Sequence, residues 1–242
     1  LAVGLAQDAA TLKDGSWMLK VAVLVSGRGS KCKAIQENIR AGKIKAEIAL
    51  VLSNVPDAPA LTFAREQGIA VWAEPHKAYP SRAAFDAAML AAMREAGVQA
   101  VVLAGYMRLL SPEFIDAYAG KIINIHPSLL PAFPGTKGGP DALAYGVKVT
   151  GCTVHFVVNA MDAGPIIIQA VVPVDAADTE ESLMSRIHVM EHRIFSQALA
   201  WLADGRLPID GEESRPGRPV PATCTAQTRT QPPPRPCLPH PP

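Results

Sequence analysis

The sequence predicts an α/β fold, built on a mostly parallel sheet with helices on both faces. Two observations lead to this prediction. Short apolar runs, of which Val21–Val25 is the first, are continuous rather than alternating, as in strands that are buried on both faces. Segments with helical periodicity separate these runs, so right-handed crossovers can return the chain to a parallel neighbour. We therefore expect ligands to bind beyond the carboxyl ends of the strands.

The composition is that of a chain with one sizeable core and no strong electrostatic field. Of the 242 residues, 49% are hydrophobic and 19% are charged, and the formal net charge is +1. Such a chain has no long-range attraction for nucleic acid or for an anionic membrane. The four cysteines match no zinc-ligand spacing, so neither a metal site nor a disulfide framework is indicated. No run is long enough for a membrane span, and we expect a cytoplasmic protein with small-molecule partners.

Three parts are expected along the chain. Residues 1–17 precede Met18, lack the pattern of a signal peptide and are expected to be a leader outside the fold. Residues 18–207 are expected to form the catalytic domain. Residues 208–242 hold eleven of the 22 prolines and no apolar periodicity, so a disordered tail is expected. Binding of such a basic, proline-rich tail to an aromatic groove or to RNA is the alternative.

The first strand leads into a glycine-rich turn. Val21–Val25 ends at Ser26–Ser30 (Ser-Gly-Arg-Gly-Ser), and helical periodicity begins at Ser30, the expected N-cap. Such a turn presents backbone N–H groups to an anion, usually a phosphate. The dinucleotide fingerprint fails because Cys32 takes the third glycine position and the next strand ends without an acidic residue. A monophosphate therefore fits better than NAD, with a tight turn that binds nothing as the alternative.

The alternation of strands and helices then continues to the end of the predicted domain. We expect strands at 47–52, 69–72, 100–104, 150–158 and 165–172, and helices at 60–67, 81–96 and 141–145. Ser111 and Pro112 open a further helix as its N-cap and first residue. The last two strands can pair antiparallel, and the alternation in 150–158 predicts a half-buried strand. A capping box at Thr179 opens the last helix, which ends at Gly205.

The stretch 122–131 contains the strongest candidate site. Asn124 and His126 are two residues apart, so on a strand they point to one face while Ile123 and Ile125 point to the other. A neutral imidazole can move a proton near pH 7, and an Asn amide can donate to an oxygen that gains charge during acyl transfer. The pair therefore suits carbonyl chemistry. Taken alone, it leaves open the alternative of a hydrogen-bonded core His beside a turn-forming Asn.

Four motifs together resemble the formyltransferases that use 10-formyltetrahydrofolate. They are Ser26–Ser30, Gly105–Arg108, Asn124–Pro131 and Met161–Ile166. The resemblance covers about residues 19–207 and is closest to members that formylate glycinamide ribonucleotide in purine biosynthesis. It implies a single-domain, Rossmann-like formyltransferase fold, with a seven-stranded, mostly parallel sheet and a C-terminal antiparallel strand pair. It also implies that the formyl group passes from 10-formyltetrahydrofolate, as co-substrate, to the amine of the ribonucleotide without a metal.

The resemblance also implies roles for individual residues. Asn124 would donate to the formyl oxygen, His126 would act as general acid/base, and Asp162 would support His126 and hold a water. The implied substrate-binding residues are Gly29, Ser30, Lys31, Cys32 and Glu191. The implied cofactor-binding residues are Arg82, Met107, Arg108, Leu109, Leu110, Asn124, Val158, Asn159, Ala160, Met161 and Asp162.

Two positions depart from the family pattern. Lys31-Cys32 replaces the Asn-Leu of many members, although a lysine can still meet a phosphate as a point charge. Lys137 stands where the family usually has His, and His155 is interpreted as a packing neighbour of the site. The alternatives are a hydrolase that releases formate from the folate, and a folate- or nucleotide-binding protein without catalysis. A monomer or a homodimer is expected.

Overall fold

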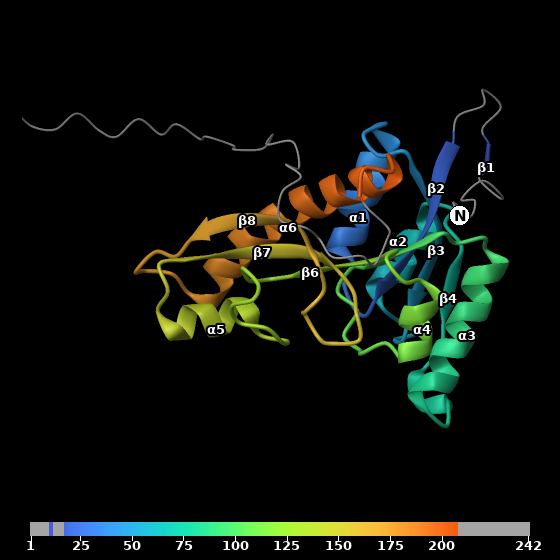
Figure 1. Ribbon diagram of the computed structural model, residues 1–242, viewed down its shortest axis with the longest axis horizontal. Coiled ribbons are helices and arrows are strands. Elements are labelled where there is room, and N and C mark those ends of the chain that lie inside the picture. Colours follow the sequence, from blue (N-terminus) through green and yellow to red (C-terminus); the bar gives the residue numbers. More distant parts are fainter. Residues whose placement is uncertain (1–9, 12–16, 208–242) are drawn as a thin grey trace, which may run out of the picture. The chain divides into compact units, whose positions relative to one another are not determined.

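One sheet organises the part of the chain that the structure describes, residues 10–11 and 17–207 of the computed structural model (Figure 1). It has eight strands in the order β4-β3-β2-β5-β6-β7-β8, with β1 paired only to β2. The strands are β1 (Ala10–Thr11), β2 (Trp17–Val25), β3 (Ala46–Ser53), β4 (Val71–Ala73), β5 (Ala100–Leu103), β6 (Ile122–His126), β7 (Val149–Phe156) and β8 (Ile166–Pro173). The helices are α1 (Ser30–Arg40), α2 (Pro59–Glu66), α3 (Arg82–Glu95), α4 (Pro112–Ala117), α5 (Gly138–Tyr145) and α6 (Glu180–Ala203), with a 3₁₀ turn η1 (His76–Ala78).

The direction of the strands changes beside β6. Strand β2 pairs parallel with β3 and β5, and β4 and β6 continue the parallel part on either side. Strands β6 and β7 then pair antiparallel, as do β7 and β8. The predicted mostly parallel sheet with a C-terminal antiparallel pair is therefore confirmed. The reversal places β6 next to the second half of β7, so that Asn124 is paired with His155 and His126 with Thr153.

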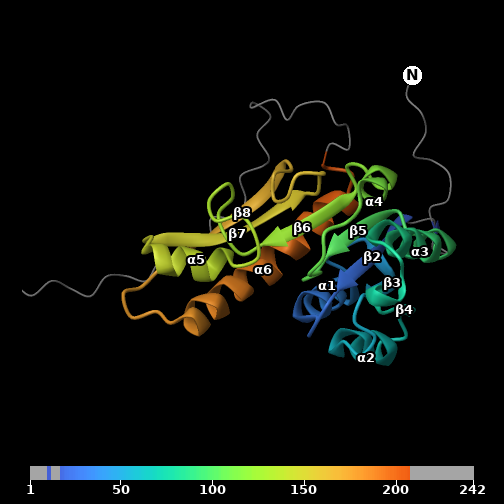
Figure 2. The same ribbon diagram turned by 90° about the horizontal axis from the view of Figure 1, so that it is seen from below.

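The sheet is covered on both faces, as predicted. The buried apolar residues form two core clusters, one on each face of the sheet. Successive residues of β2 alternate between them, with Val21 and Val23 in the first cluster and Ala22 and Leu24 in the second. The first cluster takes its helical residues from α1, α2 and α6, and the second takes them from α3 and α4. Figure 2 shows these two groups of helices on opposite sides of the strands. Buried strand residues therefore explain the continuous apolar runs in the sequence.

Several predicted boundaries need correction. Trp17 already belongs to β2, and Ala10–Thr11 pairs with the start of that strand, so the expected leader is not wholly outside the sheet. Helix α1 has Gly29 rather than Ser30 as its N-cap, because Gly29 adopts a positive φ of 72° and Ser30 is already helical. Helix α5 begins three residues earlier than predicted, at Gly138. The capping box of Thr179 is present, with Ser182 as its partner.

Strand β7 is buried on both faces rather than half-buried. Its core face is as predicted, with Cys152, Val154 and Phe156 in the first core cluster. The opposite face carries Thr153 and His155, which are polar but only 0% and 2% exposed. The loop that follows β6 hydrogen-bonds to Thr153, and Asp162 in the loop that follows β7 lies 3.8 Å from His155, so both side chains are covered. None of the described helices is both long and apolar enough to cross a membrane. The predicted tail lies outside the described residues, as does most of the predicted leader.

Candidate active site

Strand β6 presents Asn124 and His126 on the face opposite Ile123 and Ile125, as its period of two predicts. Ile123 and Ile125 belong to the first core cluster, whereas Ile122, which shares the parity of Asn124, belongs to the second. Past Ile122 on this face, polar side chains replace apolar ones, and the start of α5 lies against His126, since a β-carbon on Gly138 would be 2.8 Å from His126 Nε2. His126 is only 3% exposed, so its surroundings are set by protein groups rather than by bulk water.

Asp162 reaches His126 from the loop between β7 and β8. Its Oδ2 lies 3.5 Å from His126 Nδ1, and its side chain is 9% exposed. Asp162 has a φ of 53°, a left-handed conformation in which Asp and Asn are enriched. The same Oδ2 accepts a hydrogen bond of 2.8 Å from the backbone N–H of Gly135. The carboxylate therefore joins three segments: the end of β6, the loop before α5 and its own turn.

Both ring nitrogens of His126 face oxygen acceptors. Nδ1 faces the Asp162 carboxylate, and Nε2 lies 2.8 Å from the carbonyl oxygen of Phe133. A neutral imidazole carries one N–H and can donate to only one of these acceptors, whereas the imidazolium donates to both. The site thus has partners for either protonation state, as a group that gains and loses a proton during a reaction requires.

His155 orients the amide of Asn124. The two residues are paired across β6 and β7, and Asn124 Nδ2 lies 3.2 Å from His155 Nε2. His155 Nδ1 lies 2.9 Å from the carbonyl oxygen of Phe156, so Nδ1 carries the proton and Nε2 accepts from the amide. Burial lowers the pKa of His155, although that carbonyl and the carboxylate of Asp162 act in the opposite direction. A neutral His155 therefore holds one N–H of Asn124 and leaves the second for a ligand.

The loop between β6 and α5 is anchored to β7 by hydroxyl groups. Thr153 Oγ1 donates to the carbonyl oxygen of Ser128 at 2.7 Å and accepts from the N–H of Leu130 at 3.0 Å. Gln169 on β8 donates to the carbonyl oxygen of Leu130 at 2.9 Å. Ser128 Oγ donates to the carbonyl oxygen of Ala132 at 2.6 Å. These bonds fix the loop that supplies the Phe133 carbonyl to His126.

The predicted anion site lies where α1 meets α6. Lys31 Nζ is 2.9 Å from Glu191 Oε2, and that carboxylate is only 1% exposed. The hydroxyl of Ser30 lies 3.2 Å from His192 Nε2. The structure therefore brings together the predicted residues Ser30, Lys31 and Glu191, from opposite ends of the described chain. Cys32 is different, because its thiol is fully buried in the core and burial raises its pKa to about 12. A contact between Cys32 and a ligand would therefore have to come from its backbone rather than from its thiol.

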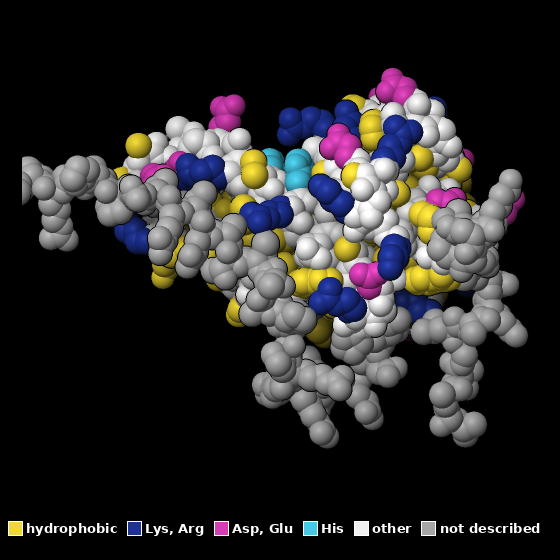
Figure 3. Space-filling view, turned by 90° about the horizontal axis from the view of Figure 1, so that it is seen from above, with side chains coloured by type: hydrophobic (Ala, Val, Ile, Leu, Met, Phe, Trp, Pro, Cys, Tyr) yellow, Lys and Arg dark blue, Asp and Glu magenta, His cyan; other side chains and the backbone are white. Residues whose placement is uncertain are grey.

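Further basic side chains surround this pair. Figure 3 shows histidine side chains next to Lys and Arg side chains on one face of the molecule. His188 Nε2 lies 3.8 Å from Glu191 Oε2, and the charges of Lys31 and Arg28 act on His188. Burial, followed by these charges, lowers the pKa of His188 despite the opposing carboxylate. A group of cations beside an uncapped helix start is suited to hold an anion.

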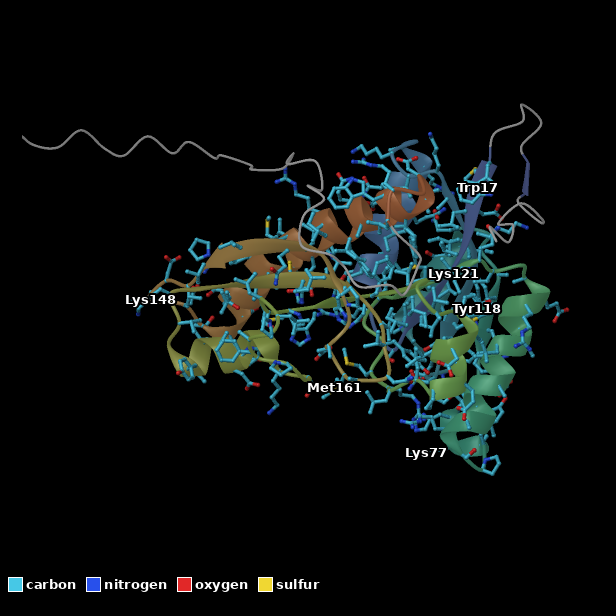
Figure 4. All side chains as sticks on the ribbon, in the orientation of Figure 1. Trp17, Lys77, Tyr118, Lys121, Lys148 and Met161 are labelled. Atoms are coloured by element: carbon cyan, nitrogen blue, oxygen red, sulfur yellow. The ribbon has the colours of Figure 1, made fainter. Side chains whose placement is uncertain are left out.

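The residues predicted to bind a folate are mostly exposed and apolar. Met107, Leu109, Val158 and Met161 are 72%, 59%, 38% and 58% exposed, which is unusual for such side chains. Figure 4 marks Met161 on the loop that leaves the sheet between β7 and β8. Asn159 and Ala160 in that loop are exposed as well, and so is Arg82 at the start of α3, while Leu110 is buried. The guanidinium of Arg108 lies over the Phe85 ring, 5.6 Å from its centroid.

Sequence reasoning missed the role of His155 and the backbone partners of the site. His155 was expected only to pack beside it, yet it contacts both Asn124 and Asp162. One signal was available: His155 falls on the face of β7 that does not carry the core residues. No signal in the sequence indicates the Phe133 carbonyl or the Gly135 N–H. Among the described residues, no group of three or more His, Cys, Asp or Glu side chains is placed to hold a metal ion.

Comparison with known proteins relates this arrangement to one family. Residues 19–199 match the formyl transferase family. The chain is 43% identical over 191 residues to phosphoribosylglycinamide formyltransferase of Escherichia coli, covering 79% of this chain and 90% of that protein. It is 44% identical over 196 residues to the bovine trifunctional purine biosynthetic protein adenosine-3, covering 81% of this chain but 19% of that protein. The crystal structure of glycinamide ribonucleotide transformylase 1 from Symbiobacterium toebii superposes with a TM-score of 0.78 at 48% identity, over 80% of this chain and 92% of that one. The chain belongs to the formyl transferase family.

Proposed function

We propose that this member of the formyl transferase family transfers the formyl group of 10-formyltetrahydrofolate to the amine of N1-(5-phosphoribosyl)glycinamide. The products are N-formylglycinamide ribonucleotide and tetrahydrofolate, and the step belongs to purine biosynthesis. The observation that best supports the proposal is the contact of 3.5 Å between Asp162 and His126, on the face of β6 that also carries Asn124. The names of the similar proteins support the choice of substrate.

The atoms of the reaction fit the groups at the site. The folate supplies the activated formyl group. The amine nitrogen of the ribonucleotide forms a bond to the formyl carbon, the bond from that carbon to the folate nitrogen breaks, and one proton passes from the amine to the folate nitrogen. Asn124 donates its free N–H to the formyl oxygen as charge develops there. His126 moves the proton, and Asp162 stabilises the cationic ring during the transfer.

The two ligands are assigned to opposite sides of this centre. The flat, apolar pterin ring suits the exposed side chains of Met107, Leu109 and Met161, and the exposed Arg82 suits a carboxylate of the folate. The turn that contains Gly29, Ser30 and Lys31 suits the phosphate of the ribonucleotide. Glu191 suits its hydroxyl groups once Lys31 turns towards the phosphate.

The wider setting is also part of the proposal. Residues 18–207 form the catalytic domain, because every residue assigned to the site lies within them. A cytoplasmic location follows from the pathway to which the similar proteins belong. A monomer or a homodimer is proposed as the acting form.

A product assay tests the proposal. Tetrahydrofolate release from 10-formyltetrahydrofolate is followed with and without glycinamide ribonucleotide, and the formylated ribonucleotide is identified by mass. Transfer requires that release depends on the ribonucleotide and that the two products form in equal amounts. Release at the same rate without the ribonucleotide would instead identify a hydrolase. Binding of both ligands without release would identify a binding protein.

A further inference from the structure

A carboxylate in the second core cluster has no role in the chemistry described above. Asp86 lies on α3 and is 1% exposed, among apolar neighbours such as Phe85 and Met89. Its Oδ2 accepts a hydrogen bond of 2.6 Å from the backbone N–H of Ser111, and its Oδ1 is buried without a hydrogen-bond partner. Burial of a carboxylate is unfavourable unless hydrogen bonds or opposite charges compensate it. Asp86 is therefore an unusual residue for a position that only fills space.

Its surroundings link it to the segment assigned to the folate. Burial raises the pKa of Asp86, while hydrogen bonds from Ser111 and the charges of Arg108 and Arg82 lower it. Arg82 is four residues earlier on α3, so the two side chains share one helix face. Arg108 stacks on Phe85, the neighbour of Asp86 in the sequence. The proposed function assigns Arg82 to the folate, and the family resemblance implies the same for Arg108.

The segment Met107–Leu110 is held by a side chain at each end. At its start, the N–H of Met107 donates to Ser26 Oγ at 2.9 Å, and that hydroxyl donates to Asn54 at 2.7 Å. Immediately after it, the N–H of Ser111 donates to Asp86. Between the two anchors, Leu110 is buried while Met107 and Leu109 are 72% and 59% exposed. The anchors therefore fix a short segment that presents its apolar side chains outwards.

We propose that Asp86 is a positioning residue, which holds Met107–Leu110 against α3 and thereby sets the affinity for the folate co-substrate. This inference rests on the proposed function. A ligand that binds a preformed segment loses no free energy in ordering it, so removing one anchor weakens binding without changing the reacting atoms. Asp86 lies on α3, outside the turn assigned to the ribonucleotide, so its removal leaves the affinity for the ribonucleotide unchanged.

Two substitutions at Asp86 separate the hydrogen bond from the charge. Asp86→Ala removes the acceptor of the Ser111 N–H and is expected to raise KM for 10-formyltetrahydrofolate about tenfold or more, with KM for the ribonucleotide within about twofold of wild type. Asp86→Asn keeps an oxygen acceptor of the same shape and is expected to restore most of the folate affinity. Met93→Ala is the matched control, because Met93 is also buried on α3 but lies about 10 Å further along the helix. It is expected to lower the melting temperature and leave both KM values unchanged.

Ser26→Ala tests the other anchor and keeps the proposal testable if Asp86→Ala does not fold. It too is expected to raise KM for the folate, whereas the KM for the ribonucleotide is judged from Asp86→Ala, because Ser26 opens the turn assigned to the phosphate. The proposal is overturned if Ser26→Ala leaves KM for the folate unchanged, if Asp86→Ala behaves like Met93→Ala, or if Asp86→Ala raises both KM values together.

A direct measurement of folate binding tests the role of Asp86 independently of the proposed formyl transfer. Titration calorimetry with tetrahydrofolate is expected to show about tenfold weaker binding to Asp86→Ala than to wild type, and near-wild-type binding to Asp86→Asn. If wild type shows no transfer to the ribonucleotide, the proposed function fails while this comparison still decides the role of Asp86. If wild type does not bind tetrahydrofolate, the role of Asp86 is refuted as well.

Discussion

Asn124 donates from Nδ2 to Nε2 of His155 over 3.2 Å, across the pair of strands at which the sheet changes from parallel to antiparallel. The bond determines which way the amide faces. It also requires the imidazole of His155 to be neutral at Nε2, which burial favours because it lowers the pKa of this histidine. The orientation of Asn124 therefore depends on a residue that need not touch either ligand.

Removing His155 should lower the rate by releasing Asn124. We expect His155→Ala to lower kcat about tenfold, less than the loss of 10² to 10³ expected when an oxyanion donor itself is removed. His155→Gln offers an amide oxygen to Asn124 and should recover part of the rate. In the double variant with Asn124→Ala, His155→Ala should have no further effect, because the two residues act as one unit. Additive losses of kcat would show that His155 acts independently of Asn124.

Replacing His126 should affect the chemical step more than binding. We expect His126→Ala to lower kcat by about 10² to 10⁴, with modest changes in both KM values, because a positioned acid/base is lost while the ligands are still aligned. Steady-state kinetics with each substrate varied in turn measure this. Imidazole added to the assay should restore part of the rate of His126→Ala and leave wild type unaffected. A kcat close to that of wild type would remove His126 from the reaction.

Substitutions of Asp162 can separate the effect of its charge from the effect of its backbone conformation. Asn tolerates the φ of 53° at this position and can still accept from the Gly135 N–H, so Asp162→Asn removes the charge alone. We expect it to lower kcat by about tenfold to a hundredfold with little loss of stability. Asp162→Gly also tolerates the backbone but loses both contacts, and it should be the slower of the two. If kcat of Asp162→Asn matched that of wild type, the carboxylate would serve only to hold the loop.

The buried histidine should make the protein less stable in mild acid. The pKa of His155 is lowered in the folded state, so below its usual value of 6.5 the unfolded chain takes up a proton that the folded chain does not. The free energy of unfolding should therefore fall as the pH drops below 6.5. His188 and His192, whose pKa values burial also lowers, contribute in the same direction.

Urea denaturation at several pH values measures this dependence. For His155→Gln, the slope of stability against pH between about pH 6.5 and 5 should be smaller by up to about 1.4 kcal/mol per pH unit. The matched variant His192→Gln changes a partly exposed histidine and should flatten the slope less. A slope in His155→Gln as steep as that of wild type would contradict the prediction.

The two glycines of the first turn should respond differently to substitution. A β-carbon on Gly29 would lie 2.5 Å from the β-carbon of Ala60, and its φ is positive, so Gly29→Ala should be destabilising by about 1–3 kcal/mol. A β-carbon on Gly27 has no neighbour within 4 Å, so Gly27→Ala should fold normally and raise KM for the ribonucleotide. Thermal denaturation and kinetics distinguish the two effects. Equal stability of the two variants would show that Gly29 is not required by packing.

Periodicity was sufficient to predict most of the fold. Strands of continuous apolar residues and helices with one apolar face depend on local sequence, and the structure confirms them from β2 to α6. Boundaries were less accurate where a backbone angle decides them, as at Gly29. The burial of Thr153 and His155 could not be predicted, because it depends on how the loops before α5 and after β7 fold back over this face of the strand.

The site was predictable in part, for reasons that differ between residues. The shared face of Asn124 and His126 follows from the period of a strand. His155 depends on the register between β6 and β7, which no local pattern determines. Asp162 was indicated only by resemblance, since its approach to His126 depends on the shape of a loop. The inward direction of Cys32 could have been predicted, because Cys32 and Ile35 are three residues apart on the buried face of α1.

His126 and Asp162, which are in contact, are much closer in the sequence than the paired residues Lys31 and Glu191. Closing the shorter loop has a lower entropic penalty, by about 1 kcal/mol for a flexible chain, so the catalytic centre can form earlier in folding than the anion site. A chain cleaved between α2 and β4 would keep Asn124, His126, His155 and Asp162 on one fragment. Lys31 would then be on the other fragment, and recovery of activity on mixing would report that the fragments reassemble, with β2 paired to β5 and α1 docked onto α6.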